Sequence, residues 1–103
     1  MRSENEIRMY YIDTLHKADQ LEELAEQLSR IANHTLQEIQ DEMTGNWKGA
    51  GSGQYLKKHM KMADLAKKHA KKLREAAVQL RSSARRLYNV EMAALAVFRR
   101  RRH

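Results

Sequence analysis

The stretch Gly45-Asn46-Trp47-Lys48-Gly49-Ala50-Gly51-Ser52-Gly53 lies near the middle of this 103-residue chain and decides its fold. It contains all four glycines and the only tryptophan of the sequence. Glycine weakens helices and permits backbone conformations that other residues rarely adopt. The segments on both sides have helical periodicity and contain no proline. The stretch therefore predicts a short turn, at about residues 45–52, between two antiparallel helices.

The segment before the turn predicts one helix over about residues 4–44. Ser3 and Glu6 have the spacing of a capping box, in which a hydroxyl and a carboxylate satisfy free backbone amides at a helix start. Apolar residues then recur at intervals of three and four, without a helix breaker before Gly45. This apolar stripe is wider than contact with one helix requires, and Leu24 and Ile31 lie at its edge.

The segment after the turn predicts a second helix over about residues 53–98, followed by a basic tail over 99–103. Its apolar positions alternate by three and four, as in a heptad repeat. One column consists of Leu56, Ala63, Ala70, Ala77 and Ala84, and the other of His59, Ala66, Leu73, Leu80, Leu87 and Ala94. A column made almost entirely of alanine allows the backbone of a neighbouring helix to approach closely.

These elements predict an all-α fold, in which residues 1–103 form a single long helix-turn-helix hairpin. A lone hairpin buries only one face of each helix, and small folds are marginal even when they are compact. Met62, Leu65 and Ala76 also lie at the edge of the contact. We therefore expect two hairpins, identical or different, to pair into a four-helix bundle. The expected packing and dimer seam comprises Leu21, Leu24, Leu28, Ile31, Ala66, Leu73 and Leu80.

The net charge of +7 is unevenly distributed along the chain. Residues 1–45 carry ten acidic and four basic residues (−6), whereas residues 46–103 carry three acidic and sixteen basic residues (+13). This charge distribution favours, as an alternative function, a basic helical nucleic-acid-binding protein. A further alternative is a peripheral protein that binds a membrane surface. The basic face lacks interleaved aromatic residues and a helix-turn-helix spacing, so we favour a solvated face and expect no nucleic-acid partner.

The sequence does not indicate an enzyme. It contains no cysteine, and its five histidines lack the spacing of a metal site. His34 and Glu38, one helical turn apart, are expected to form a surface pair. We expect no catalytic residue, metal, cofactor or small-molecule substrate. The first residues lack the apolar core of a signal peptide, and no segment has the roughly 20 apolar residues of a membrane span.

Trp47-Lys48-Gly49, centred between two long helical segments, resembles the WXG family of proteins of type VII secretion systems in Gram-positive bacteria. The resemblance implies a dimeric four-helix bundle that leaves the cytoplasm without a signal peptide. It also implies a recognition turn at Trp47 and Gly49. The implied partners are a second copy, another WXG-like protein or the N-terminal hairpin of a toxin, together with the type VII secretion ATPase.

The export signal of that family is a tyrosine followed four residues later by Asp or Glu. Here the residue four positions after Tyr88 is Met92, and the nearest acidic residue, Glu91, lies three positions after Tyr88. Leu87 lies four positions before Glu91 but is not a tyrosine. The resemblance thus implies a degenerate export or partner-contact patch of Leu87, Tyr88 and Glu91.

Because the second helix is the longer one, we expect the two-helix contact to end before Glu91. The expected function is a secretion substrate or a chaperone-like adaptor.

Overall fold

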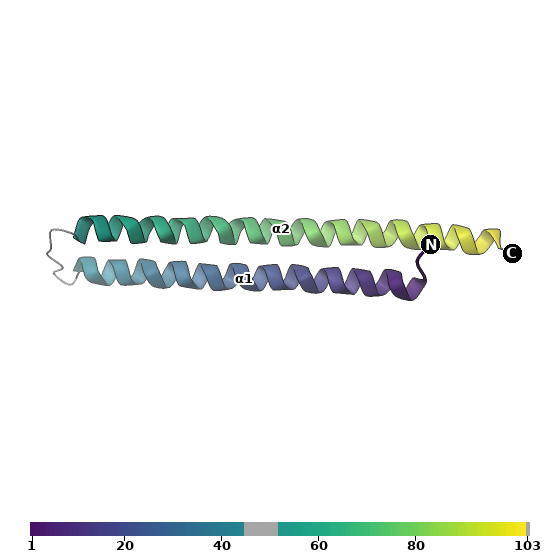
Figure 1. The fold of residues 1–103 in the computed structure, drawn as a ribbon, viewed down its shortest axis with the longest axis horizontal. Helices are drawn as coiled ribbons and strands as arrows, with labels where there is room; N and C mark the ends of the chain where they lie inside the picture. Colours follow the sequence, from purple (N-terminus) through teal and green to yellow (C-terminus); the bar gives the residue numbers. More distant parts are fainter. Residues whose placement is uncertain (45–51, 103) are drawn as a thin grey trace. The chain divides into compact units, whose positions relative to one another are not determined.

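The computed structural model describes residues 1–44 and 52–102, which form two long helices (Figure 1). Helix α1 spans Glu4–Thr44 and helix α2 spans Ser52–Arg101. The described residues contain no strand, so the all-α prediction is confirmed. The predicted recognition turn, with Trp47 and Gly49, lies outside the described residues.

The ends of the helices follow local sequence signals. The Glu6 amide donates to the Ser3 Oγ at 3.2 Å and the Ser3 amide donates to Glu6 Oε1 at 3.4 Å, which confirms the capping box. Helix α2 ends at Arg101, so the prediction of a non-helical tail from residue 99 is wrong for Arg99–Arg101. Arginine is a good helix former, and positive charge in the last turn interacts favourably with the helix dipole.

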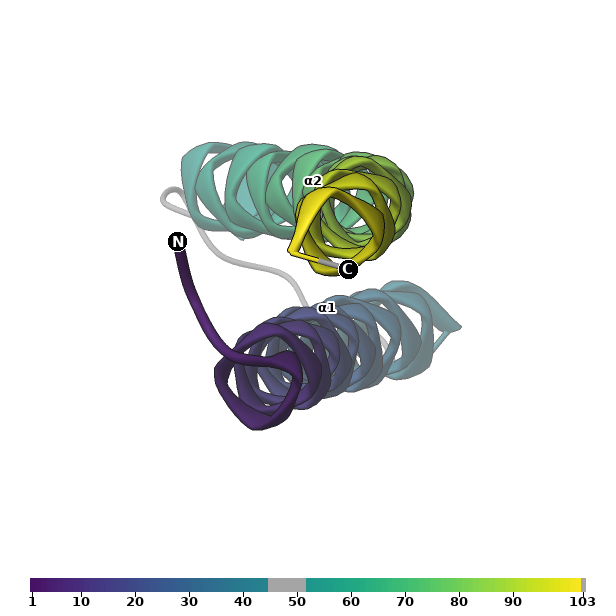
Figure 2. The ribbon, with the colours of Figure 1, turned by 90° about the vertical axis from the view of Figure 1, so that its right-hand side faces the viewer.

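The chain divides into two compact units, and each pairs a segment of α1 with a segment of α2. Figure 2 shows the two helices in an end-on view. Unit 1 comprises Met1–Glu22 and Glu75–His103, and unit 2 comprises Glu23–Arg74. In unit 1 the pairing is antiparallel, because Arg99 contacts Glu4 whereas Arg81 contacts Asp19.

Alanine dominates the contact between the helices in both units. In α1 the fully buried residues are Ala18, Ala25 and Ala32, and in α2 they are Ala70 and Ala77, all 0% exposed. The predicted alanine column of α2 is thus confirmed as the buried side of that helix. Side chains of this size allow helix axes to approach to the short end of the usual 8–10 Å range.

The register of the contact changes in unit 1 after Leu80. The heptad predicted that Leu87 and Ala94 continue the seam, but both are exposed. The half-buried Tyr88 and the 7% exposed Leu95 take their place. The buried and half-buried positions advance by four residues twice in succession, from Leu80 to Ala84 and from Ala84 to Tyr88. Such a stutter of the heptad locally unwinds the supercoil of the two helices. The shift brings a tyrosine and a leucine into the contact in place of a leucine and an alanine.

Candidate interaction site

Unit 2 has one side on which polar side chains bridge the two helices. The guanidinium of Arg74, on α2, donates from Nη2 to the Ser29 Oγ of α1 at 2.8 Å. The same nitrogen lies 4.0 Å from Glu26 Oε2. On this side the contact between the helices is therefore covered by a polar bridge.

The other side of unit 2 is apolar and exposed. Leu24 and Ile31 are one heptad apart on α1 and are 49% and 59% exposed, and Met62 on α2 is 58% exposed. Leu24 and Ile31 each directly precede a buried alanine of α1, and helical geometry places them on the side of the contact opposite Ser29. Met62 lies on the side of α2 opposite Arg74. All three therefore flank the same side of the antiparallel pair. We call Leu24, Ile31 and Met62 the apolar side.

The predicted seam set accordingly divides into two classes. Its half-buried members, which pack between the helices of their own unit, are Leu21, Leu28, Ala66, Leu73 and Leu80. Its remaining members, Leu24 and Ile31, stay exposed. The sequence predicts both residues at the edge of the apolar stripe of α1, and in the structure both are exposed.

The patch predicted at Tyr88 and Glu91 lies within unit 1. The Tyr88 ring is half-buried, and its centroid lies 4.9 Å from that of Tyr11 with 33° between the ring planes. Arg2 Nη2 donates to Glu91 Oε1 at 2.6 Å, and the side chain of Glu91 is only 18% exposed. The guanidinium of Arg2 also lies 4.7 Å from the Tyr10 ring centroid.

The expectation that the two-helix contact ends before Glu91 is therefore wrong. Residues at the start of the chain extend the contact, because Arg2 supplies the counter-charge that a carboxylate at a seam position requires. Leu87 is 37% exposed and is the most accessible member of the patch. The structure thus places Tyr88 and Glu91 in an intramolecular contact with Tyr11 and Arg2.

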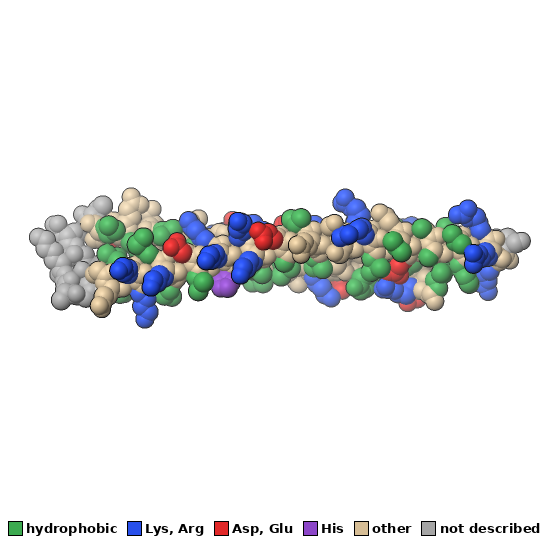
Figure 3. Space-filling model, turned by 90° about the horizontal axis from the view of Figure 1, so that it is seen from above, with side chains coloured by type: hydrophobic (Ala, Val, Ile, Leu, Met, Phe, Trp, Pro, Cys, Tyr) green, Lys and Arg blue, Asp and Glu red, His purple; other side chains and the backbone are tan. Residues whose placement is uncertain are grey.

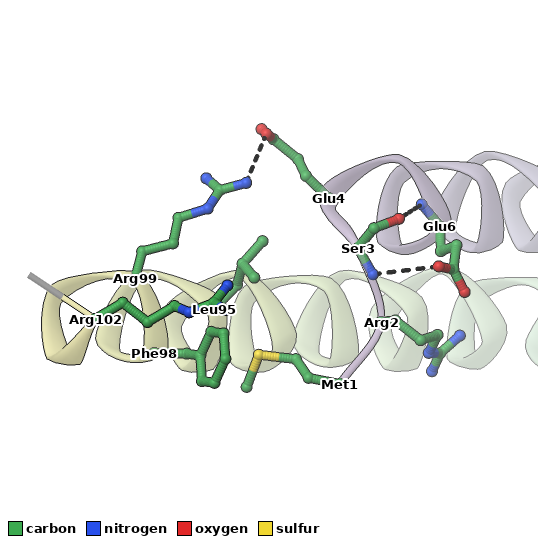
Figure 4. Close-up of a pocket in the computed structure, with 9 residues that line it drawn as sticks. All are labelled: Met1, Arg2, Ser3, Glu4, Glu6, Leu95, Phe98, Arg99 and Arg102. Atoms are coloured by element: carbon green, nitrogen blue, oxygen red, sulfur yellow. Dashed lines mark hydrogen bonds and ion pairs between the residues drawn. The ribbon is translucent and has the colours of Figure 1, made fainter.

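An open groove of about 480 Å³ lies between the first residues of the chain and the last turns of α2, within unit 1 (Figure 4). Arg99 Nη2 lies 3.4 Å from Glu4 Oε2, and the guanidinium of Arg102 lies 5.4 Å from the Phe98 ring centroid. Hydrogen bonds from Arg8 and Arg99 lower the pKa of Glu4 below its ordinary value. Arg99, in α2, and Arg102, which directly follows α2, thus both have partners in the protein.

Several charged side chains of the helices pair with one another within the chain. Arg81 bridges from α2 to Asp19, at 2.7 Å, and to Glu22, and these two carboxylates raise its pKa further above the ordinary value. The expected surface pair is present, with His34 Nε2 3.0 Å from Glu38 Oε1. Within residues 1–44 and 52–102, no group of three His, Asp or Glu could hold a metal ion. In the same ranges no helix is long and apolar enough to cross a membrane.

Comparisons with known proteins identify the family. No curated protein and no solved structure matches the chain. The model of the PPE family matches residues 13–98, most of both helices. That family is mycobacterial, is associated with type VII secretion, and is related to but distinct from the WXG family that the central turn resembles. The chain therefore belongs to the PPE family and is a type VII secretion-related protein.

Proposed function

We propose that the chain is a non-enzymatic substrate or adaptor of type VII secretion that pairs with a second helical hairpin and helps to present an export signal. The partner is a second copy of the chain or the hairpin of a different protein, such as the N-terminal region of a toxin. Family membership supports the link to secretion. The pairing is supported by a single observation, the apolar side of unit 2.

The apolar side provides the driving force for pairing. Leu24, Ile31 and Met62 retain 49%, 59% and 58% of their exposure although they flank the helix contact. Full burial of one such side chain contributes about 1.5–3 kcal/mol. Since roughly half of each remains exposed, covering all three would contribute about 2–4 kcal/mol per hairpin. In a two-fold symmetric dimer the same side would be covered on both copies.

In this proposal, the patch of Leu87, Tyr88 and Glu91 near the C-terminal end of α2 contributes to the contact with the partner. Tyr88 and Glu91 are held by Tyr11 and Arg2, so their positions are set before a partner binds. Leu87, at 37% exposure, is the member that a partner or the secretion ATPase contacts first.

The pairing is tested by size-exclusion chromatography with light scattering on the double variant Leu24→Gln/Ile31→Gln. We expect the dimer, or the complex with a co-expressed partner, to weaken by more than tenfold, because two apolar anchors become polar. Ile12→Gln is the matched control, since Ile12 is 55% exposed and lies on the outward face of α1 in unit 1. Unchanged assembly of the double variant, or equal weakening by the control, would refute the assignment of the apolar side.

The role in secretion is tested at the central turn. We expect Trp47→Arg to abolish secretion or complex formation while the helical circular dichroism signal stays unchanged, because Trp47 lies between α1 and α2 in the sequence. Normal export of this variant would count heavily against a recognition role for Trp47 and Gly49.

A further inference from the structure

Helix α2 begins with two similar basic clusters. Lys57-Lys58-His59-Met60-Lys61 is followed ten residues later by Lys67-Lys68-His69-Ala70-Lys71-Lys72. All seven lysines are exposed, and Asp64 is the only acidic residue between the two clusters. Both clusters belong to unit 2.

These lysines have no carboxylate partner among the described residues. The charged contacts that α2 makes with α1 use the arginines Arg74, Arg81 and Arg99, which flank the helix contact. By helical geometry most of these lysines lie on the opposite, outward face of α2. Their positive charge is therefore not neutralised by the acidic half of the chain.

An exposed leucine lies in the centre of this face. Leu65 is 55% exposed. Residues three, four and seven positions away lie on the same helix surface, and here these neighbours include Lys58, Lys61, Lys68 and Lys72. Figure 3, which looks onto α2, shows basic side chains gathered next to the undescribed segment, with apolar side chains among them. We call Leu65 with these four lysines the lysine face.

We propose that the lysine face binds the surface of an anionic lipid bilayer. Clusters of four to eight basic residues on an amphipathic helix are attracted to anionic headgroups. Residues 58–72 span roughly 21 Å of helix, which allows the four lysines to contact headgroups together. Their aliphatic stems and Leu65 can enter the boundary between headgroups and acyl chains.

The leucine distinguishes a bilayer from a nucleic acid. A central Leu65 gains nothing against a row of phosphates, and within the lysine face there is no aromatic ring on which a base could stack. Most of the lysine face points away from α1, although Leu65 lies one helical turn from Met62 of the apolar side. The two proposals are tested by different variants, because Leu24 and Ile31 lie on α1 whereas the lysine face lies on α2. Either proposal can therefore fail without the other.

The test is flotation of the full chain with vesicles of phosphatidylcholine, with and without phosphatidylglycerol. We expect binding only to the anionic vesicles, weakened roughly 25-fold by Lys61→Gln/Lys68→Gln, since each lysine near the surface contributes about fivefold. Arg85→Gln/Arg86→Gln is the matched control, because it removes two exposed charges of α2 outside the lysine face. We expect it to change binding less than threefold.

A second variant separates membrane from nucleic acid. Leu65→Gln keeps every charge, and we expect it to weaken vesicle binding several-fold while binding to a short DNA duplex stays unchanged. The proposal is overturned by absence of binding to anionic vesicles, by equal losses in the lysine and arginine variants, or by unchanged vesicle binding of Leu65→Gln. Tighter binding to the duplex than to the vesicles at the same salt would assign the face to nucleic acid instead.

Discussion

Replacement of one buried alanine tests the close packing of the two helices. Ala77 is 0% exposed in the contact between α1 and α2 of unit 1, whereas its neighbour Ala76 is exposed. Ala77→Leu and Ala76→Leu are the same chemical change at adjacent positions. Both keep a good helix former, so a difference between the two reports on packing and not on helix propensity.

Whether Ala77→Leu raises or lowers the free energy of unfolding depends on how tightly the two helices are packed. Leucine adds three carbon atoms, which would contribute about 2.4 kcal/mol if the site could open and bury them without strain. In a closely packed site, added atoms instead force strained rotamers or backbone shifts that typically cost about 1–3 kcal/mol. With no exposed surface at Ala77, we expect net destabilisation by about 1–3 kcal/mol. Ala76→Leu should stay within about 0.5 kcal/mol of the parent.

Urea unfolding followed by far-UV circular dichroism, at one fixed protein concentration, measures both variants. In thermal unfolding, a loss of 1 kcal/mol in a chain of this size corresponds to a Tm lower by about 4–8 °C. If Ala77→Leu were as stable as the parent or more stable, close approach of the helices through alanine would be refuted. Equal losses at both positions would show that the effect is not one of packing.

Three further predictions concern the polar and aromatic contacts of unit 1. Arg81→Gln removes the pairs with Glu22 and Asp19 and should lower the urea midpoint only slightly, a loss that disappears at 1 M salt. The pKa of Glu4 is lowered in the folded protein, so its contribution to stability is present above its ordinary pKa of 4.5 and is lost as the pH falls through the lower folded value. Glu4→Gln should therefore flatten the decline of Tm on acidification, and an unchanged decline would contradict the assignment. A double-mutant cycle of Tyr11→Leu and Tyr88→Leu should give a coupling free energy of about 0.5–1.5 kcal/mol, whereas a value near zero would show that the rings do not interact.

The fold could be predicted from local signals that act over one or two helical turns. Ser3 and Glu6 are close in sequence, so the capping box was readable before any tertiary contact was known. The alanine column of α2 repeats every seven residues, which identifies the buried side of the helix. The helix predicted over 53–98 ends three residues before the observed end at Arg101, because a run of arginines is typical of a solvated tail but arginine also extends helices well.

The patch at the end of α2 was less predictable because it depends on long-range contacts. Glu91 follows Ala84 of the alanine column by seven residues, but its partner Arg2 lies 89 residues away in the sequence. No periodicity in α2 could indicate that the start of the chain reaches this position. The stutter that buries Tyr88 was likewise hidden, because a strict heptad offers Leu87 as an equally apolar alternative.

The composition of the contact explains why an exposed apolar side persists beside it. Among the described residues no large side chain is fully buried, and most of the buried residues are alanines. Alanine allows close approach but removes little apolar area from water per residue, so the hairpin alone gains little from burial. Leucines within the contact, such as Leu28 and Leu73, are only half-buried, and Leu24, Ile31 and Met62 lie exposed beside it. A contact made largely of alanine and half-buried leucine, next to an exposed apolar side, is suited to a hairpin whose stability depends on a second hairpin, which is the arrangement that the proposed function requires.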